Sequence, residues 1–441
     1  MKEYESIAED LRTLREQLAL FSPSLEEAQE HFEDWDYATA DTKTETHGFH
    51  SYPAMMIPQV ARRLLNMFGK RGDVVLDPFC GSGTVLVEAK MLGMNSWGID
   101  INPLALLLAR VKSTPLDVGM LQRHALELLD TYRENYGRIE GEKDFVSVPE
   151  FFNIDYWFKP KVSRHLSFIR ELIFAIRDTK VREFFLVAFS ETVREVSNTK
   201  SKEFKLVRMS SEELEKYNPD VGRVFFSKVY RNIKGMAEFV MKADPNVWVR
   251  ILREDTRSRT SIPERSVDLV VTSPPYGDSR TTVAYGQFSR LSLQWLGLPW
   301  EEVRKIDSES LGGKKGPEHS PFSTPLLKET LHRIADIDPK RSQEVMSFYH
   351  DFGLCMKEVH RVCKSGAKAC FVVGNRTVKG IRIPTDGILV ELAEMLGFKH
   401  LDTYHRNIPS KRMPSKNSPS NIPGQVGETM TKEHIVVLEK V

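Results

Sequence analysis

The stretch Val74-Val75-Leu76-Asp77-Pro78-Phe79-Cys80-Gly81-Ser82-Gly83-Thr84 begins with a short apolar run and ends in a glycine turn. The apolar run predicts a buried strand, and the residues from Thr84 to Leu92 have the pattern of a helix. A second strand is expected over 96–100, and Asn102-Pro103 then opens another helix, because proline is favoured in the first turn. This strand-helix-strand-helix order is typical of a doubly wound parallel sheet.

The same alternation predicts how the chain is divided. It stops near residue 114, where a largely helical stretch begins, and further strands are expected at 249–252, 267–271, 369–373, 398–404 and 434–438. The sequence therefore predicts an α/β fold with a Rossmann-like sheet, mostly parallel, an antiparallel closing strand and a helical insertion. The expected parts are an N-terminal helical segment (1–45), the first part of the sheet domain (46–113), the helical insertion (114–247) and the second part of the sheet domain (248–441), with a flexible loop at 300–343.

The composition is that of an ordinary globular protein. The chain has 441 residues, 28% of them charged and 41% hydrophobic, and a net charge of +1, which neither supports nor excludes a nucleic-acid partner. The four cysteines have no metal-site spacing and are too few for a disulfide scaffold. No apolar run reaches the roughly 18 residues of a membrane helix, and the N-terminus lacks a signal pattern. We expect a soluble, cytoplasmic protein without a metal site.

The glycine turn has the chemistry of a cofactor site. Gly81 and Gly83 allow a ligand to approach the backbone, and the following helix N-terminus favours a carboxylate or phosphate. Asp100, at the end of the next strand, can hold ribose hydroxyls. A nicotinamide dinucleotide site would use similar geometry, but its third glycine is replaced by Leu86, and Asp77 would repel a pyrophosphate and attract an ammonium group. The alternative without function is a simple strand-helix turn.

A second motif, Thr272-Ser273-Pro274-Pro275-Tyr276, follows the strand expected over 267–271. Active sites of open α/β sheets lie at this end of the strands. The two prolines remove two N–H donors and leave carbonyl oxygens, the Ser273 hydroxyl and the Tyr276 ring. This set suits an amino group on a planar base, because the oxygens can accept its hydrogens while the ring stacks. The alternative is a rigid proline turn at the end of a strand.

Together the two motifs resemble those of the S-adenosylmethionine-dependent DNA amino-methyltransferases, most closely the cytosine-N4 branch known from restriction-modification systems. The resemblance covers residues 46–112 and 248–440, and the cofactor motif precedes the catalytic one, opposite to many cytosine-N4 enzymes. It implies S-adenosyl-L-methionine as cofactor, bound by Tyr52, Pro53, Asp77, Pro78, Phe79, Gly81, Gly83, Thr84, Asp100, Ile101 and Asp255. It implies catalysis by Ser273, Pro274, Pro275 and Tyr276.

The resemblance also indicates the target atom. Serine at the first position of the tetrad is associated with cytosine N4, and Asp or Asn with adenine N6, so Ser273 favours cytosine. Covalent attack on cytosine C5 uses a Pro-Cys pair, and none of the four cysteines follows a proline. Adenine-N6 methylation and methylation of RNA or of a protein amide remain as alternatives, as does a non-catalytic nucleic-acid-binding protein on this fold.

A base inside duplex DNA must be flipped out to reach such a pocket, and flipping needs contacts to phosphates. Residues 159–234 contain 17 Lys and Arg against 10 Asp and Glu, and residues 404–427 contain no acidic residue. The helical insertion is a candidate target-recognition region, and a cognate restriction endonuclease is a candidate partner in the cell. The expected DNA-binding residues are Lys314, Lys315, Arg406, Lys411, Arg412 and Lys416.

The two cofactor hypotheses predict different stabilising ligands. S-adenosylhomocysteine should raise the melting temperature in a thermal-shift measurement, because a ligand that binds only the folded state stabilises it. NAD should leave the melting temperature unchanged at the same concentration. The opposite result would favour a nicotinamide-dependent oxidoreductase.

Overall fold

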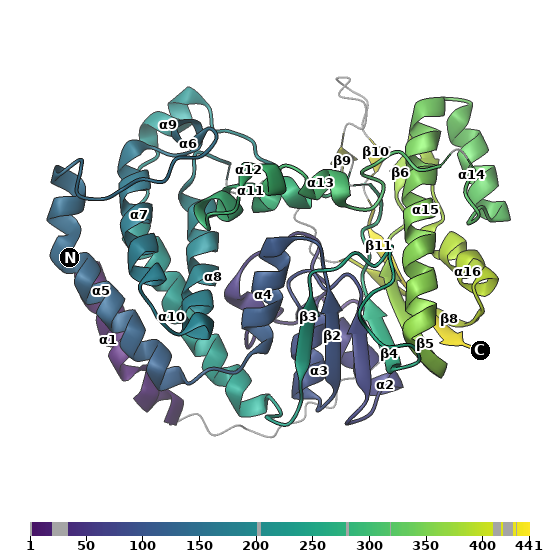
Figure 1. Cartoon of the computed structure of the whole chain (residues 1–441), viewed down its shortest axis with the longest axis horizontal. Helices are drawn as coiled ribbons and strands as arrows, with labels where there is room; N and C mark the ends of the chain where they lie inside the picture. The colour runs from purple at the N-terminus through teal and green to yellow at the C-terminus, as the bar shows by residue number, and fades with distance from the viewer. Residues whose placement is uncertain are drawn as a thin grey trace.

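The computed structural model describes residues 2–19, 34–200, 204–278, 282–317, 319–408, 416–417, 427–428 and 430–441. Its centre is a seven-stranded sheet in the order β3-β2-β1-β4-β5-β11-β8 (Figure 1). All neighbouring strands pair in parallel up to β5, and β11 pairs antiparallel with both β5 and β8. The strands are β1 (Val74–Asp77), β2 (Asn95–Ile99), β3 (Val249–Leu252), β4 (Val267–Thr272), β5 (Cys363–Val373), β8 (Phe398–Asn407) and β11 (Lys432–Lys440).

The prediction of a mostly parallel, Rossmann-like sheet with an antiparallel closing strand is confirmed. The closing strands extend beyond their predicted bounds, and two-residue strands pair outside the main sheet. These are β6 (Thr377–Val378) with β7 (Ile381–Arg382), and β9 (Lys416–Asn417) with β10 (Gly427–Glu428).

Helices cover both faces of the sheet because successive strand residues point to opposite sides. Val75 and Leu269 pack with α2 and α3, whereas Leu76 and Val270 pack with α15 and α16. Proline stands in the first turn of α2, α4, α14 and α15, where its missing N–H costs no helical hydrogen bond. These helices are α2 (Pro58–Phe68), α3 (Thr84–Met91), α4 (Pro103–Ser113), α14 (Pro325–Ala335), α15 (Pro339–Val362) and α16 (Thr385–Met395).

The helical insertion forms a bundle beside the β3 end of the sheet, with a core of its own (Figure 1). The N-terminal helix α1 packs against this bundle, and Tyr4 Oη donates to Asp220 Oδ1 at 2.6 Å. The long helices of the bundle, including α1 and α11 from outside the insertion, are α1 (Lys2–Ala19), α5 (Val118–Gly141), α7 (Pro160–Phe174), α8 (Thr179–Val196), α10 (Val221–Lys242) and α11 (Tyr285–Trp295). The short ones are η1 (His47–Phe49), α6 (Ile154–Trp157) and α9 (Ser211–Lys216).

The prediction of a flexible loop at 300–343 is wrong, because this stretch is largely helical. It contains α12 (Trp300–Val303), α13 (Ile306–Glu309), α14 and the start of α15. Thr324 Oγ1 caps α14 by accepting from the Leu327 N–H, and Asp338 caps α15 by accepting from the Arg341 N–H. The Gly-Lys-rich stretch that suggested a loop occupies only the connection between α13 and α14.

Within the ranges that the structure describes, no helix is both long enough and apolar enough to cross a membrane.

A glycine contact joins the bundle to the segment before the cofactor motif. A Cβ at Gly235 of α10 would lie 2.1 Å from the Glu45 carbonyl oxygen, whereas a Cβ at Gly137 of α5 would meet nothing within 4 Å. We expect Gly235→Ala to lower the free energy of unfolding by about 1–3 kcal/mol, as overpacking does. Gly137→Ala should raise it by about 0.5–1 kcal/mol. Urea denaturation of both variants checks this, and equal effects would contradict it.

Candidate active site

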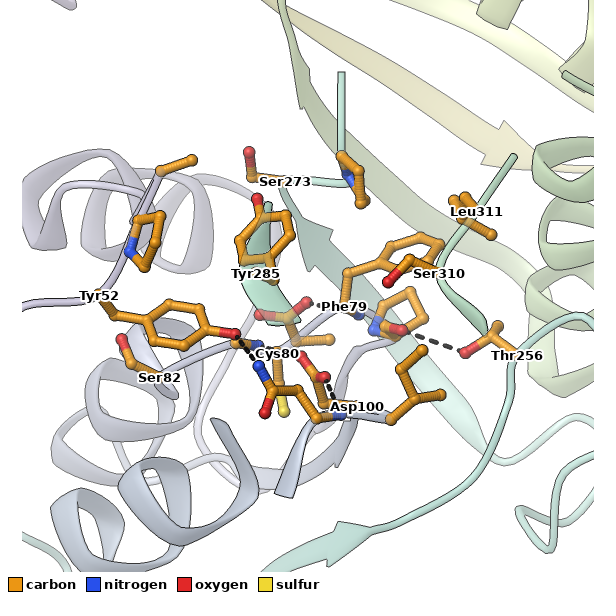
Figure 2. A pocket seen from close by; sticks show the side chains of 18 of the residues that line it. Tyr52, Phe79, Cys80, Ser82, Asp100, Thr256, Ser273, Tyr285, Ser310 and Leu311 are labelled. Carbon is orange, nitrogen blue, oxygen red and sulfur yellow. Dashed lines mark hydrogen bonds between the residues drawn. The ribbon is translucent and has the colours of Figure 1, made fainter. Parts of the chain in front are cut away.

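One pocket lies at the carboxyl ends of the parallel strands and contains ten of the eleven predicted cofactor residues. Gly83 is the exception, since it caps the N-terminus of α3. Figure 2 shows Tyr52, Tyr285 and Ser273 on one side of this pocket and Thr256, Ser310 and Leu311 on the other. The predicted residues in its wall are Tyr52, Pro53, Asp77, Pro78, Phe79, Gly81, Thr84, Asp100, Ile101 and Asp255.

The glycine turn between β1 and α3 needs glycine for two reasons. Gly81 and Gly83 have φ angles of +47° and +85°, a region that other residues rarely adopt. A Cβ at Gly83 would also lie 2.8 Å from the Ala109 Cα, so the close contact of α3 with α4 requires its absence. The turn therefore brings the N-terminus of α3, with its free N–H groups, to the edge of the pocket.

Asp77 is 4% exposed and sits at the base of the pocket. Thr272 Oγ1 donates to its Oδ1 at 2.7 Å and the Phe79 N–H donates to the same atom at 3.2 Å. Burial raises the pKa of the Asp77 carboxyl to about 7, although these two hydrogen bonds act in the opposite direction. A cationic ligand beside Asp77 would restore its charged form.

Asp100 ends β2 and is fixed by two backbone donors. The Gly81 N–H donates to Oδ2 at 3.0 Å and the Asn102 N–H to Oδ1 at 2.8 Å. Burial raises the pKa of Asp100 to about 6. Each oxygen keeps a lone pair for a further donor, as a ribose diol would require.

Tyr52 and Tyr285 form an aromatic wall of the pocket, with ring centroids 5.8 Å apart and an interplanar angle of 28°. Asn102 Nδ2 donates to Tyr52 Oη at 3.1 Å and to Ser289 Oγ at 2.8 Å, which ties the wall to α11. Tyr52 was predicted from the sequence, whereas Tyr285 and Asn102 were not. Asn102 could have been found from its place two residues after Asp100.

Asp255 lies in the pocket wall, but its carboxylate already has a partner. Arg257 binds both oxygens, with Nε 3.0 Å from each and Nη2 2.6 Å from Oδ2, and its Nη1 reaches Asp351 at 2.9 Å. The resemblance to the DNA amino-methyltransferases implies that Asp255 binds the cofactor, at the position whose carboxylate accepts from the adenine amine. An adenine amine there would have to share the carboxylate with Arg257.

The tetrad Ser273–Tyr276 separates this pocket from a smaller one. Ser273 and Pro275 line the cofactor pocket, Pro274 is buried, and Tyr276 lines the second pocket. Ser273 Oγ and Tyr276 Oη are 3.2 Å apart, and Tyr276 Oη donates to Glu433 Oε1 at 2.9 Å. Burial, followed by the charge of Glu433, raises the pKa of Tyr276 well above its usual value, so the phenol keeps its proton.

The predicted DNA-binding residues that the structure describes do not form one surface. Lys314 and Lys315 are exposed, three and four positions after the pocket residue Leu311. Arg406 is 6% exposed, and its guanidinium donates to Glu433 at 2.6 Å and to the Trp35 carbonyl at 3.1 Å, so its assignment to DNA phosphates is wrong. Lys411 and Arg412 lie outside the described residues, and Lys416 is described only as part of β9.

The cysteines are not placed for covalent catalysis. Cys80 lies in the cofactor turn, and burial raises the pKa of its thiol well above the usual value. Cys355, Cys363 and Cys370 are buried as well, with thiol pKa values that burial raises. Among the residues described here, no group of three or more His, Cys, Asp or Glu side chains could hold a metal ion.

Comparison with known proteins gives the family. The profile of a DNA methylase family matches residues 4–110. Over 426 residues the chain is 41% identical to M.MvaI, a type II methyltransferase of Kocuria varians, covering 91% of this chain and 93% of that protein. The chain belongs to the type II DNA methyltransferases. These are DNA methylases of restriction-modification systems, with S-adenosylmethionine as methyl donor.

Two other relatives show how far the similarity extends. The type II methyltransferase M.BsoBI of Geobacillus stearothermophilus is 25% identical over 91% of this chain and 87% of its own length. A tRNA (guanine(10)-N2)-dimethyltransferase of Methanothermobacter thermautotrophicus is 48% identical, but over only 12% of this chain and 16% of its own length. The whole-length similarity is thus to type II methyltransferases, and that to the tRNA enzyme is local.

The pocket of this type II methyltransferase suits S-adenosylmethionine in its donor set. Asp77 offers a carboxylate for the ammonium, the N–H groups at the start of α3 suit the carboxylate, and Asp100 suits the ribose hydroxyls. Ile101 and Leu311 provide apolar surface for a purine. When bound, the cofactor supplies a methyl group on a sulfonium, and the pocket residues named above would hold the cofactor.

The raised pKa of Asp77 predicts that ligand binding depends on pH. S-adenosylhomocysteine carries the same ammonium, so its affinity should rise about tenfold from pH 6 to pH 8, as Asp77 ionises near pH 7. Without ligand, the free energy of unfolding changes with pH in the opposite direction to the affinity. The raised pKa of Asp77 favours the folded state at low pH, and this contribution to stability is lost as pH rises through 7. Isothermal titration calorimetry at both pH values checks the affinity.

Asp77→Asn is the control, because it keeps the shape and removes the titration. It should bind weakly at both pH values and, without ligand, be more stable than the wild type at pH 8. A variant that retained the full pH dependence would show that another group is responsible.

Proposed function

We propose that this type II methyltransferase transfers the methyl group of S-adenosylmethionine to N4 of cytosine within a short recognition sequence of duplex DNA. The observation that carries the proposal is the position of the tetrad between two pockets, with Ser273 facing the cofactor side and Tyr276 the other. A base held in the second pocket would present its amine to the methyl group across Ser273. A flipped base is then required, since a stacked base cannot enter.

The second pocket has features that a flat polar base requires. It combines aromatic and apolar side chains with the buried ion pair of Arg376 and Asp278, whose Nη2 and Oδ2 are 3.3 Å apart. Guanidinium donors suit the N3 and O2 acceptors of cytosine, which lie beside N4 on the same edge of the base. Its wall consists of Tyr276, Gly277, Asp278, Val345, Phe348, Tyr349, Arg376 and Ile383.

The reaction needs only positioning and acceptance of hydrogen bonds. Ser273 Oγ and the Pro274 carbonyl oxygen would accept the two amine hydrogens, which increases the electron density on nitrogen. The nitrogen would attack the methyl carbon, with the C–N bond forming as the C–S bond breaks; S-adenosylhomocysteine would leave and the nitrogen would release a proton to water. We propose a single displacement with no covalent enzyme intermediate.

The remaining parts of the proposal concern DNA. Lys314 and Lys315 are exposed near the pocket rim and would contact phosphates. The bundle would carry target recognition, since α6, α9 and α12 lie at the same end of the molecule as α13, which contributes Ile306 to the pocket (Figure 1). On this surface Phe152 is 56% exposed and Arg208 lies 4.3 Å above the Tyr156 ring. A separate restriction endonuclease of the same specificity would be the cellular partner.

The first test is to incubate the protein with methyl-labelled S-adenosylmethionine and mixed-sequence duplex DNA, and to identify the labelled nucleoside after digestion. The proposal predicts N4-methylcytosine. N6-methyladenine would keep the family and the tetrad but contradict the role given to Ser273. Label in RNA or protein instead of DNA would contradict the choice of polymer.

Tyr276→Ala is the matched variant for this assay. It should reduce transfer by at least about 100-fold, because the stacking ring and its hydroxyl are both lost. Stabilisation by S-adenosylhomocysteine should persist, since Tyr276 does not line the cofactor pocket. Loss of cofactor binding in this variant would mean that the two pockets are not separate.

A further inference from the structure

The tetrad is connected to the far strands of the sheet by a chain of side-chain contacts. Ser273 Oγ is 3.2 Å from Tyr276 Oη, which donates to Glu433 Oε1 at 2.9 Å. The other carboxylate oxygen of Glu433 accepts from Arg406 Nη1 at 2.6 Å. Glu433 therefore lies between a guanidinium and the tyrosine of the tetrad.

The donors and acceptors in this series of hydrogen bonds are determined by the groups at the Arg406 end. Arginine has donors only and an ionised carboxylate has acceptors only, so Glu433 can only accept from Tyr276. The tyrosine has one proton, and it is committed to Glu433. The contact between Ser273 and Tyr276 must then use the serine proton, which leaves the lone pairs of Ser273 Oγ for another donor.

We infer that Glu433 is a positioning residue for methyl transfer: by taking the Tyr276 proton it orients the Ser273 hydroxyl as an acceptor for the target amine. This inference deepens the proposed function and rests on it. Without Glu433, Tyr276 could donate to Ser273, and the serine proton would point toward the amine hydrogens. The serine O–H and the amine N–H would then face each other as two donors, and the hydrogen bond that activates the nitrogen would be weakened.

The sheet holds Glu433 firmly in this position. Glu433 of β11 and Arg406 of β8 are directly opposite each other in the antiparallel pair, where oppositely charged side chains attract. Arg406 also donates to the carbonyl oxygens of Trp35 at 3.1 Å and Asp36 at 3.4 Å. The Glu433 side chain is only 15% exposed, so water competes little for its oxygens.

Glu433→Gln tests the inference, because the amide keeps the size and removes the charge. Its NH2 group is disfavoured beside the Arg406 guanidinium and will face Tyr276, where it donates to the hydroxyl and reverses the direction of the chain. We expect the single-turnover rate of methyl transfer to DNA to fall by about 10- to 100-fold. The KM for S-adenosylmethionine and the stabilisation by S-adenosylhomocysteine should stay unchanged.

Glu439→Gln is the matched control, since Glu439 lies on the same strand and is also paired, with Lys368 of β5. It should transfer methyl groups at the wild-type rate. A similar loss of rate in both variants would mean that any disturbed ion pair on β11 slows the enzyme, and would overturn the inference.

Tyr276→Phe provides a second test that leaves the Glu433–Arg406 pair intact. It should lower the rate, and adding Glu433→Gln should lower it no further, because Glu433 acts through the missing hydroxyl. Additive effects, or a wild-type rate in either single variant, would overturn the inference. A wild-type protein that transfers no methyl group to DNA would instead refute the proposed function, and the inference with it.

Discussion

The site depends on the hydrogen bond from Thr272 Oγ1 to Asp77 Oδ1, 2.7 Å long, which joins the ends of two adjacent parallel strands. Asp77 ends β1 and begins the cofactor turn, while Thr272 ends β4 and directly precedes the Ser273–Tyr276 tetrad. Because both residues are buried, neither can exchange this partner for water. The cofactor motif and the tetrad are therefore held in a fixed relation although 195 positions separate them.

The helical bundle supports the same site from the opposite side. Glu191 of α8 accepts from the Ser51 N–H at 3.1 Å, and Arg231 of α10 donates to the Phe49 carbonyl at 2.8 Å. Charges of His50, Lys228 and Arg231 lower the pKa of Glu191 to about 2 despite its burial, so it stays ionised near neutral pH. The insertion thus fixes the segment that carries Tyr52 into the cofactor pocket.

The parts of the fold that sequence analysis predicted have local signals. The strands and the turn at Gly81 and Gly83 follow from apolar runs and glycines, and the tetrad from its prolines. The residues that sequence analysis missed act through partners that are distant in the sequence: Tyr285 of α11 stacks on Tyr52, which precedes α2. Arg406 was misassigned because its neighbours in sequence are not acidic, while its partner Glu433 lies on the adjacent strand.

The helices within 300–343 were missed for a different reason. The Gly-Lys-rich connection dominated the pattern there, whereas the capping residues Thr324 and Asp338 give only a short signal. The ion pair of Asp255 is likewise a feature that the local sequence pattern did not predict. Its position in the pocket could be predicted from the motif, but its pairing with Arg257 depends on the turn between them.

The burial of all four cysteines has a practical consequence for spectroscopy. Thiol reagents react with exposed thiolates, and here burial both covers the sulfur atoms and disfavours their ionised form. A single cysteine introduced at an exposed position, such as that of Lys315, would be the preferred site for a fluorophore or spin label. The native background thus allows a probe to be placed near the pocket rim without first removing any cysteine.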